Sequence, residues 1–181
     1  MQKGVDNEIS YVDDDPFLKA EAIERYMKSH ERIIFVDFGI SLDEKSIAQC
    51  FEKHEGVGCL VFPGVKEGID WGLFRHKVQT GSTEPTEQMG LNFDTEIGAK
   101  ISDDIYKVKT TTSKAWCMNT KNVIKSIKDK KSGKWTINPK MFAKFTEQGV
   151  RIYAFTAAKL VMTYTHECIS NILNAAGIKV N

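Results

Sequence analysis

The sequence predicts a single α/β domain over residues 1–181, with a mixed, mainly parallel sheet flanked by helices. A length of 181 residues suits one domain. Hydrophobic residues make up 41% of the chain and charged residues 27%, which is ordinary globular composition. Apolar runs with strand character also alternate with segments of helical period, and that order is typical of α/β proteins.

The first predicted elements are a helix over residues 17–30 and a strand over residues 32–37. Asp15 can cap the helix and Pro16 suits its first turn. The expected apolar stripe of the helix is Leu18, Ala22, Ile23 and Tyr26. The strand is continuously apolar up to its final carboxylate, which indicates burial on both faces of a mostly parallel sheet.

A second helix and strand follow directly. Ser41 and Glu44 have the spacing of a capping box and predict a helix that continues through Phe51. Residues 56–63, with the sequence Gly-Val-Gly-Cys-Leu-Val-Phe-Pro, predict the next strand and its stop. Together with the strand over residues 32–37 they form a βαβ unit of about 30 residues. In such sheets, ligands bind beyond the carboxyl ends of the strands.

The rest of the chain predicts a long excursion and then a mixed second half. Residues 66–92 are rich in glycine and polar residues, so we expect a long loop with one short helix within residues 69–78. Further strands are predicted over residues 96–101, 105–109, 115–118, 150–155 and 160–164. Further helices are predicted over residues 119–130, 139–148 and 167–176.

Composition excludes several classes of protein. A net charge of +1 gives no global attraction to nucleic acid or to anionic lipid. The polar, acidic start does not resemble a secretory signal, and no apolar run approaches the ~20 residues that span a bilayer. We therefore expect a soluble, cytoplasmic protein without a membrane span. The cysteines form no CxxC pair and are expected to be reduced thiols: Cys50, Cys59, Cys117 and Cys168.

The tripeptide Asp37-Phe38-Gly39 follows the first apolar strand. Asp-Phe-Gly in that position is the magnesium-binding signature of protein kinases. The chain has no HRDxxxxN catalytic loop and no Gly-rich loop before it, and no Ala-Pro-Glu after it. These absences exclude a protein kinase.

A longer pattern extends from the first helix to Trp71. It comprises residues 33–40 with the sequence Ile-Ile-Phe-Val-Asp-Phe-Gly-Ile, Ser46-Ile47 in the next helix, and residues 60–66. This order resembles the nucleotide-sugar glycosyltransferases of the GT-A fold, especially short enzymes of large DNA viruses and bacteria. In that family an apolar strand ends in an Asp-x-Asp motif, and the next strand leads to a proline-containing loop. Residues 114–123 and 148–153 are similar to the family's acceptor-side strand with its helix and to its late strand.

The resemblance implies transfer of a sugar from a nucleotide-sugar donor to a glycan or protein acceptor. Mn²⁺ or Mg²⁺ would assist by neutralising the diphosphate, with Asp37 and His166 as metal ligands. The residues implied in donor binding are Asp37, Gly39, Pro63, Lys66 and Trp71. The residues implied in catalysis or acceptor contact are Glu67, Asp70 and Asp94.

The chain also departs from the family pattern. Gly39 replaces the second aspartate of Asp-x-Asp, and the family's N-terminal nucleoside-binding unit is not seen before the first helix. The chain thus resembles a truncated or degenerate member, and the alternative function is a non-catalytic relative that binds a protein or glycan partner. Asp37 could equally be a turn residue, with Gly39 supplying a positive φ. His166 lies at a predicted strand-to-helix junction, where a histidine is more often a capping or packing residue than a metal ligand.

Two charged clusters have simpler interpretations. The carboxylates of residues 13–15 suit the start of a helix, where they cap backbone N–H groups. Six lysines between Lys121 and Lys134, beside Trp116 and Trp135, could follow the phosphates of a nucleic acid. Such runs are more often the solvated face of a helix, so nucleic acid is not expected as the partner.

Overall fold

The computed structural model describes residues 6–66 and 68–162. The helices are α1 (Pro16–Met27), α2 (Glu44–Gln49), α3 (Trp71–Gln79), the 3₁₀ turn η1 (Thr86–Gln88), α4 (Thr120–Ile127) and α5 (Met141–Glu147). The strands are β1 (Arg32–Val36), β2 (Ile40–Leu42), β3 (Cys59–Val61), β4 (Thr95–Ser102), β5 (Ile105–Thr111), β6 (Ala115–Asn119), β7 (Ile152–Phe155) and β8 (Leu160–Met162). The helix expected over residues 167–176 lies outside the described residues.

Six of the strands form one mixed sheet in the order β1-β6-β3-β7-β5-β4. The α/β class is therefore confirmed, but the expectation of a mainly parallel sheet is wrong. Within this sheet only β3 and β7 pair in parallel, and the other neighbours are antiparallel. Strands β1 and β3 do point the same way, but β6 lies between them and pairs with both. In the predicted βαβ unit, β1 and β3 would be direct neighbours. In the structure β6, from much later in the chain, lies between them.

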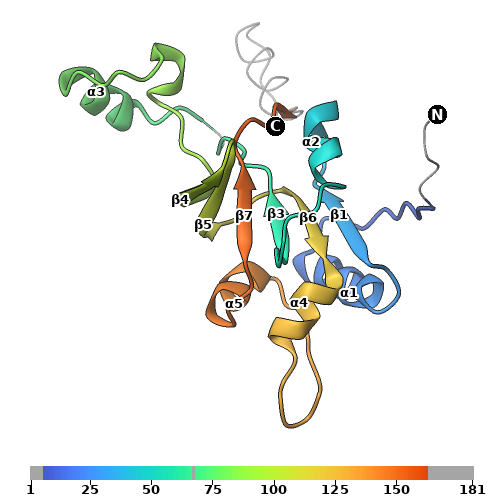
Figure 1. Cartoon of the computed structure of the whole chain (residues 1–181). Helices are drawn as coiled ribbons and strands as arrows, with labels where there is room; N and C mark the ends of the chain where they lie inside the picture. Colours follow the sequence, from blue (N-terminus) through green and yellow to red (C-terminus); the bar gives the residue numbers. More distant parts are fainter. Residues whose placement is uncertain (1–5, 67, 163–181) are drawn as a thin grey trace, which may run out of the picture.

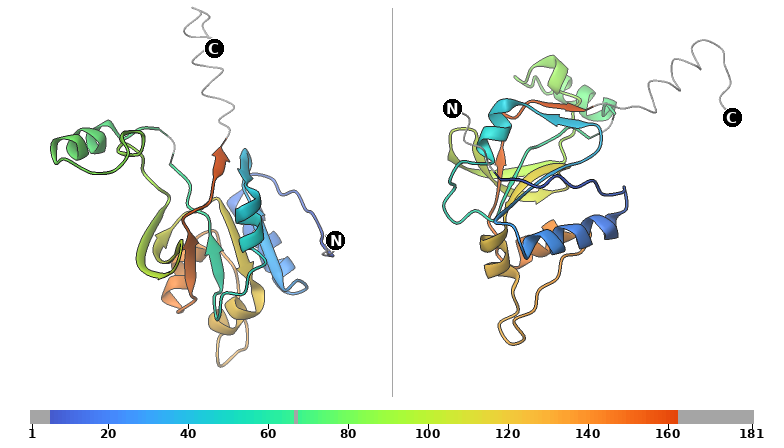
Figure 2. Two further views of the ribbon diagram at one scale, coloured as in Figure 1. Left: turned by 45° about the horizontal axis from the view of Figure 1, so that its top comes forward. Right: turned by 90° about the vertical axis from the view of Figure 1, so that its right-hand side faces the viewer.

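The sheet is covered on both faces (Figure 1). Trp116 and Met118 of β6 pack in one core with the buried residues of α1, α4 and α5. Ala115 and Cys117 of the same strand point to the other face and pack near α2 and the β2–β8 ribbon. The side view in Figure 2 shows α1, α4 and α5 on one side of the sheet and α2 on the other. Period-two alternation in the central strands thus produces two cores.

Strand β1 lies at an edge of the sheet, contrary to the expectation that it is buried on both faces. Ile33 and Phe35 pack toward α1, but Ile34 and Val36 on the opposite face are each 41% exposed. The central strands are β3, β6 and β7. A continuous apolar run shows that a strand can be buried but does not show how many neighbours it has.

Helix boundaries follow the capping chemistry of individual residues. Asp15 caps α1 as predicted, accepting hydrogen bonds from the N–H groups of Phe17 (2.8 Å) and Leu18 (2.9 Å). The buried residues of α1 are Ala20, Ile23 and Met27, so only Ile23 of the predicted stripe is buried. Helix α2 begins after Asp43, whose carboxylate accepts from the Ser46 N–H, because Ser41 belongs to β2.

Residues 66–92 form an arm that projects from the β4 side of the sheet (Figure 1). It contains α3, which buries none of its residues, and η1. Its two ends meet where the Lys66 N–H donates to the Asn92 carbonyl at 2.7 Å. The prediction of a long excursion with one short α-helix is confirmed. Among the described helices, none has the length and apolar character required to cross a membrane.

Candidate functional site

The carboxyl edge of the sheet gathers several of the residues singled out in the sequence. Since β1, β3 and β7 point in one direction, Asp37 and Pro63 emerge at the same edge. The β5–β6 connection lies there too, because the Ser113 hydroxyl donates to the Phe62 carbonyl at 2.9 Å. Ligands are expected at this edge of an α/β sheet.

A groove of about 630 Å³ opens beside Asp37 on the α1 side of the sheet. We call it the Asp37 groove. Its walls come from the start of α1, the end of β1, the β5–β6 connection and residues 138–143. Its charged lining residues are Asp37, Lys19, Lys114 and Lys140. The groove therefore combines one carboxylate with three ammonium groups.

Aromatic side chains make the apolar part of the Asp37 groove. Phe35 of β1 lies opposite Trp116 of β6 in the antiparallel register, and their rings stack with centroids 5.0 Å apart. Phe142 meets Trp116 edge to face at 6.1 Å. Trp116 is almost fully buried, so this wall is held by the core. A fixed apolar wall beside charged groups is typical of small-molecule sites.

Asp37 is paired with a lysine. Lys19 Nζ lies 2.9 Å from Asp37 Oδ1 and also contacts Asp14 Oδ1, and the Lys19 and Asp37 side chains are 19% and 23% exposed. Burial alone would lower the pKa of Lys19, but hydrogen bonds to Asp14 and Asp37 outweigh it and raise the pKa. Lys19 is consequently a fixed positive charge in the groove.

The Asp-Phe-Gly tripeptide forms a turn. The Ile40 N–H donates to the Asp37 carbonyl at 3.2 Å, and Gly39 has a φ of 74°. A non-glycine residue is strained in that conformation, so Gly39 serves the turn between β1 and β2. Gly39 can meet a ligand only through its backbone. Phe38, at the tip of the turn, is 85% exposed.

Asp94 ties the loop after β3 to the start of β4. Its Oδ1 accepts from the Gly64 N–H at 3.1 Å and from the Thr95 hydroxyl at 2.8 Å. Burial raises the pKa of Asp94, although these hydrogen bonds and the charges of Lys66 and Lys114 act in the opposite direction. A half-buried carboxyl group with a raised pKa at a sheet edge is a candidate for proton transfer.

Pro63 and Lys66 line a second hollow of about 600 Å³, together with Phe93 and Leu160. Lys66 also lies close enough to Asp94 to affect its pKa, and so does Lys114 from the Asp37 groove. Asp94 lines neither hollow, but the charge of one lysine from each hollow reaches it. The structure brings Asp37, Pro63, Lys66 and Asp94 to one edge of the sheet.

Asp70 and Trp71 lie in the projecting arm, apart from β1 (Figure 1). Asp70 caps α3 by accepting from the Leu73 N–H at 2.8 Å, and its Oδ2 accepts from the Asn92 side chain at 3.1 Å. These bonds, with that of Leu73 first, lower the pKa of Asp70. Trp71 is 61% exposed. Glu67 and His166 lie outside the described residues, so their predicted roles stay predictions.

The divalent ion implied by the resemblance finds few ligands here. Within residues 6–66 and 68–162, no group of three His, Cys, Asp or Glu side chains is placed to hold a metal. Among the described residues, Asp37 is the only carboxylate that lines the groove, and its Oδ1 already pairs with Lys19. Since Mn²⁺ and Mg²⁺ prefer several oxygen ligands, the described residues do not form a metal site by themselves.

Sequence reasoning missed Lys19 and Lys140, and assigned no role to Lys114. Lys19 does carry a signal, because it lies four residues before Ile23 and hence on the buried face of α1. A lysine at such a position needs a partner or a ligand. Lys140 has no comparable signal, since only the packing of residues 138–143 against the sheet brings it to the groove.

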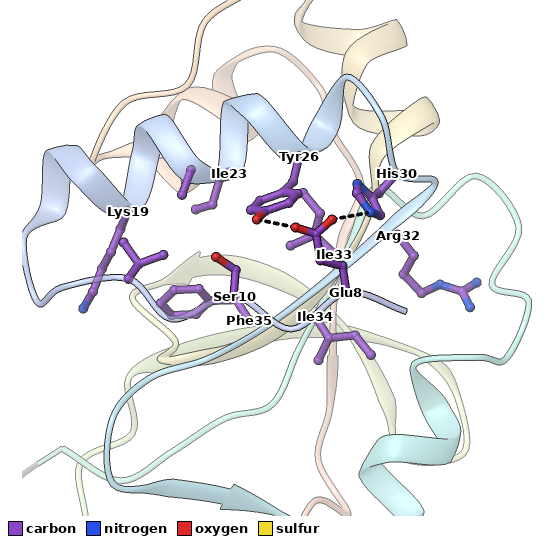
Figure 3. A pocket seen from close by; sticks show the side chains of 12 residues that line it. Glu8, Ser10, Lys19, Ile23, Tyr26, His30, Arg32, Ile33, Ile34 and Phe35 are labelled. Atoms are coloured by element: carbon purple, nitrogen blue, oxygen red, sulfur yellow. Dashed lines mark hydrogen bonds and ion pairs between the residues drawn. The ribbon is translucent and has the colours of Figure 1, made fainter. Parts of the chain in front are cut away.

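A small cavity of about 140 Å³ lies between α1, β1 and the segment that precedes α1 (Figure 3). Glu8 reaches into it, accepting from the Tyr26 hydroxyl at 2.9 Å and lying 3.6 Å from His30 Nε2. Lys19 and Phe35 line both this cavity and the Asp37 groove. The segment before α1 is therefore attached beside the groove.

The lysine run lies on and after α4, at the opposite edge of the sheet. Helix α4 follows β6, which points away from the carboxyl edge of the sheet, where Asp37 lies. Lys121, Lys125 and Lys128 are exposed, as expected for the solvated face of a helix. The run therefore does not extend the charge of the groove.

Comparisons of the chain with protein-family models, curated proteins and solved structures found no match. The functional interpretation consequently depends on the geometry of the sheet edge and on the residue pattern described above.

Proposed function

We propose that the chain is a glycosyltransferase-like domain that binds a nucleotide-sugar donor in the Asp37 groove and transfers the sugar to a glycan or protein acceptor. The observation that carries the proposal is the gathering of one carboxylate and three ammonium groups beside an aromatic wall, at the carboxyl edge of the sheet. The GT-A-like residue pattern leads to this same edge. The residue pattern and the charges of the groove thus both support donor binding at this edge.

The ammonium groups suit the diphosphate of the donor. A diphosphate has several anionic oxygens, and Lys19, Lys114 and Lys140 offer the matching charge from three different elements. Negative charge grows on the diphosphate as the sugar leaves, so cations already in place stabilise the transition state more than the bound donor. Mn²⁺ or Mg²⁺ enters this proposal only with the donor, whose phosphates would have to supply most of its ligands.

Asp94 is the proposed general base. The acceptor hydroxyl oxygen forms a bond to the anomeric carbon, the bond from that carbon to the diphosphate breaks, and the hydroxyl proton passes to Asp94. A raised pKa brings a carboxylate closer to the strength this step needs. Asp94 lines neither hollow, but Lys114 of the Asp37 groove and Lys66 of the second hollow are both near enough to affect its pKa. In this proposal the donor occupies the groove, the acceptor occupies the second hollow, and the acceptor hydroxyl reaches Asp94.

The second candidate function is binding of a protein or glycan partner at this edge without catalysis. It is favoured by the Lys19–Asp37 ion pair and by the role of Gly39 as a plain turn residue. In this case the groove would be a recognition surface for an anionic group without transfer. The two functions differ in whether a donor is consumed.

The first experiment is a thermal-shift titration with UDP and GDP, each with and without Mn²⁺. A ligand at 100 times its dissociation constant stabilises the folded state by about 2.7 kcal/mol, which shifts the melting temperature measurably. We expect a nucleotide-dependent shift in the wild type. Lys114→Ala should reduce this shift, because it removes one of the three ammonium groups of the groove. Lys114 is exposed, so its replacement should leave the fold intact.

Lys121→Ala is the matched control, since it removes an exposed lysine from the opposite edge of the sheet. An equal loss of the shift in both variants would remove the groove from the proposal. A shift without release of free sugar or product from UDP-sugar and GDP-sugar donors would favour the non-catalytic candidate. The absence of any shift, with or without Mn²⁺, would contradict donor binding.

A further inference from the structure

Two of the cysteines meet on the α2 face of the sheet, away from the Asp37 groove. Cys50 ends α2, and its Sγ lies 3.5 Å from the Ser46 carbonyl oxygen. Cys117 lies in β6, and its Sγ lies 3.6 Å from the Cys50 carbonyl oxygen. Each thiol also affects the pKa of the other. They come from distant parts of the sequence, so only the fold unites them.

The thiol pair lines an open cavity of about 490 Å³. Arg32 and His54 line it as well. The Nε2 atom of His54 is buried and has no hydrogen-bond partner among the described residues. A polar, roomy cavity admits water and other small polar molecules. Although Cys50 and Cys117 are only 3% and 6% exposed, a small reagent in this cavity would therefore reach both.

We propose that Cys50 and Cys117 are a reversible oxidation site that forms an intramolecular disulfide with a hydroperoxide as oxidant. In the first step the Cys50 thiolate attacks the peroxide, an S–O bond forms, the O–O bond breaks and hydroxide leaves. In the second step Cys117 attacks the resulting sulfenic acid, the S–S bond forms, the S–O bond breaks, and water leaves with the Cys117 proton. Two thiols are oxidised as one peroxide is reduced to water.

The surroundings decide which thiol reacts first. A hydrogen bond from Cys117 and the charge of Arg32 lower the pKa of Cys50, against the effect of its burial. The same hydrogen bond and burial raise the pKa of Cys117. The thiolate is the nucleophile, so Cys50 attacks and Cys117 resolves. The product would join the end of α2 covalently to the centre of the sheet.

Cys59 is the internal control. It lies on the opposite face of β3, in the core with α1, α4 and α5, and is fully buried. Burial raises the pKa of its thiol. Cys59 has no access to the cavity that Cys50 and Cys117 share, and so it should stay reduced under the conditions that oxidise the pair. Cys168, outside the described residues, is followed separately by its own peptide.

The test is oxidation of the native full chain with hydrogen peroxide, followed by alkylation and peptide mass spectrometry of every cysteine. We expect Cys50 and Cys117 to disappear together into one linked peptide that dithiothreitol reverses. Cys117→Ser should stop at a sulfenic acid on Cys50, which dimedone traps. Cys50→Ser should slow oxidation of Cys117 several-fold or more, because it removes the thiol that attacks the peroxide first. Cys59→Ser should oxidise like the wild type.

Several outcomes would overturn the proposal. Oxidation of Cys59 as fast as Cys50 would show that the cavity confers no selectivity. A disulfide only between chains, or one from Cys50 to Cys168, would remove Cys117 as the partner. Circular dichroism before oxidation shows whether each variant is folded. If both the Cys50→Ser and Cys117→Ser variants unfold, the peptide mass spectrometry of the oxidised wild type still shows whether Cys50 and Cys117 form the disulfide.

Discussion

At the residue scale, the chemistry of the carboxyl edge of the sheet depends on how the surroundings of Lys19 and Asp94 shift their pKa values. Lys19 is held by Asp14 and Asp37, and the two ion pairs keep its charge inside the groove. Asp94 has the opposite character, because burial disfavours its charged form. A pair of groups whose surroundings push their pKa values away from the ordinary range is typical of a working site.

Asp94→Asn should stabilise the protein at neutral pH. The pKa of Asp94 is raised in the folded state, so the folded state binds its proton more tightly than the unfolded state does. Ionisation of Asp94 therefore costs stability, and the cost grows as pH rises from the unfolded pKa through the folded pKa. The asparagine amide keeps an oxygen that can accept from the Gly64 N–H and carries no charge.

The measurement is the melting temperature of wild type and Asp94→Asn between pH 3 and pH 8. The advantage of the variant should shrink as the pH falls and vanish once both states of the wild type are protonated. If Asp94 is the general base, the same variant should lose transfer activity while keeping nucleotide binding. A variant that is less stable at neutral pH would show that the lysine charges outweigh burial.

At the element scale, the fold depends on a close approach of the start of β3 to α4 and to the segment that precedes β7. Gly58 precedes β3, and its N–H donates to the Arg151 carbonyl at 2.9 Å. A Cβ added at Gly58 would collide with Val150 and would come within 3.1 Å of Val123. Both valines are buried in the core of α1, α4 and α5. Glycine is thus required here for space.

Gly58→Ala should lower the free energy of unfolding by about 1–3 kcal/mol, the usual range for an overpacked core. Gly98→Ala in β4 is the matched control, because its Cβ would only reach the Lys107 carbonyl oxygen at 3.4 Å. Urea unfolding followed by circular dichroism measures both. Equal stability of the two variants would show that Val150 can move aside without cost.

At the scale of the whole molecule, the arm and the sheet have separate roles. Helix α3 contributes no buried residue, and the arm returns to its starting point through the Lys66–Asn92 hydrogen bond. Two cores, one on each face of the sheet, hold the other described elements together. Segments with few buried contacts have low local stability and contribute little to global unfolding.

Replacement of residues 67–91 by a short Gly-Ser linker should leave cooperative unfolding intact. The ends of the deleted segment are already adjacent, so closing them with a shorter loop costs little entropy. The melting temperature should stay within a few degrees of that of the wild type. Nucleotide binding should persist, because no described residue of the arm lines the Asp37 groove.

Thermal shift with and without UDP or GDP measures both properties in one experiment. Loss of nucleotide binding in a folded deletion variant would place the donor on the arm, near Trp71, as the resemblance implies. Loss of acceptor-dependent transfer alone would instead assign the arm to the acceptor. A variant that fails to fold would show that the arm contributes to the core.

The sequence alone determined the approximate position of most described elements, the capping of α1 by Asp15 and the excursion over residues 66–92. These features depend on neighbours a few residues away, and residue pattern records such neighbours directly. The tertiary structure alone decided that β6 lies between β1 and β3, with Phe35 opposite Trp116. It also decided that Lys19 meets Asp37 and that Cys50 meets Cys117. Strand order and these contacts join residues far apart in the chain, and local periodicity contains no information about such pairings.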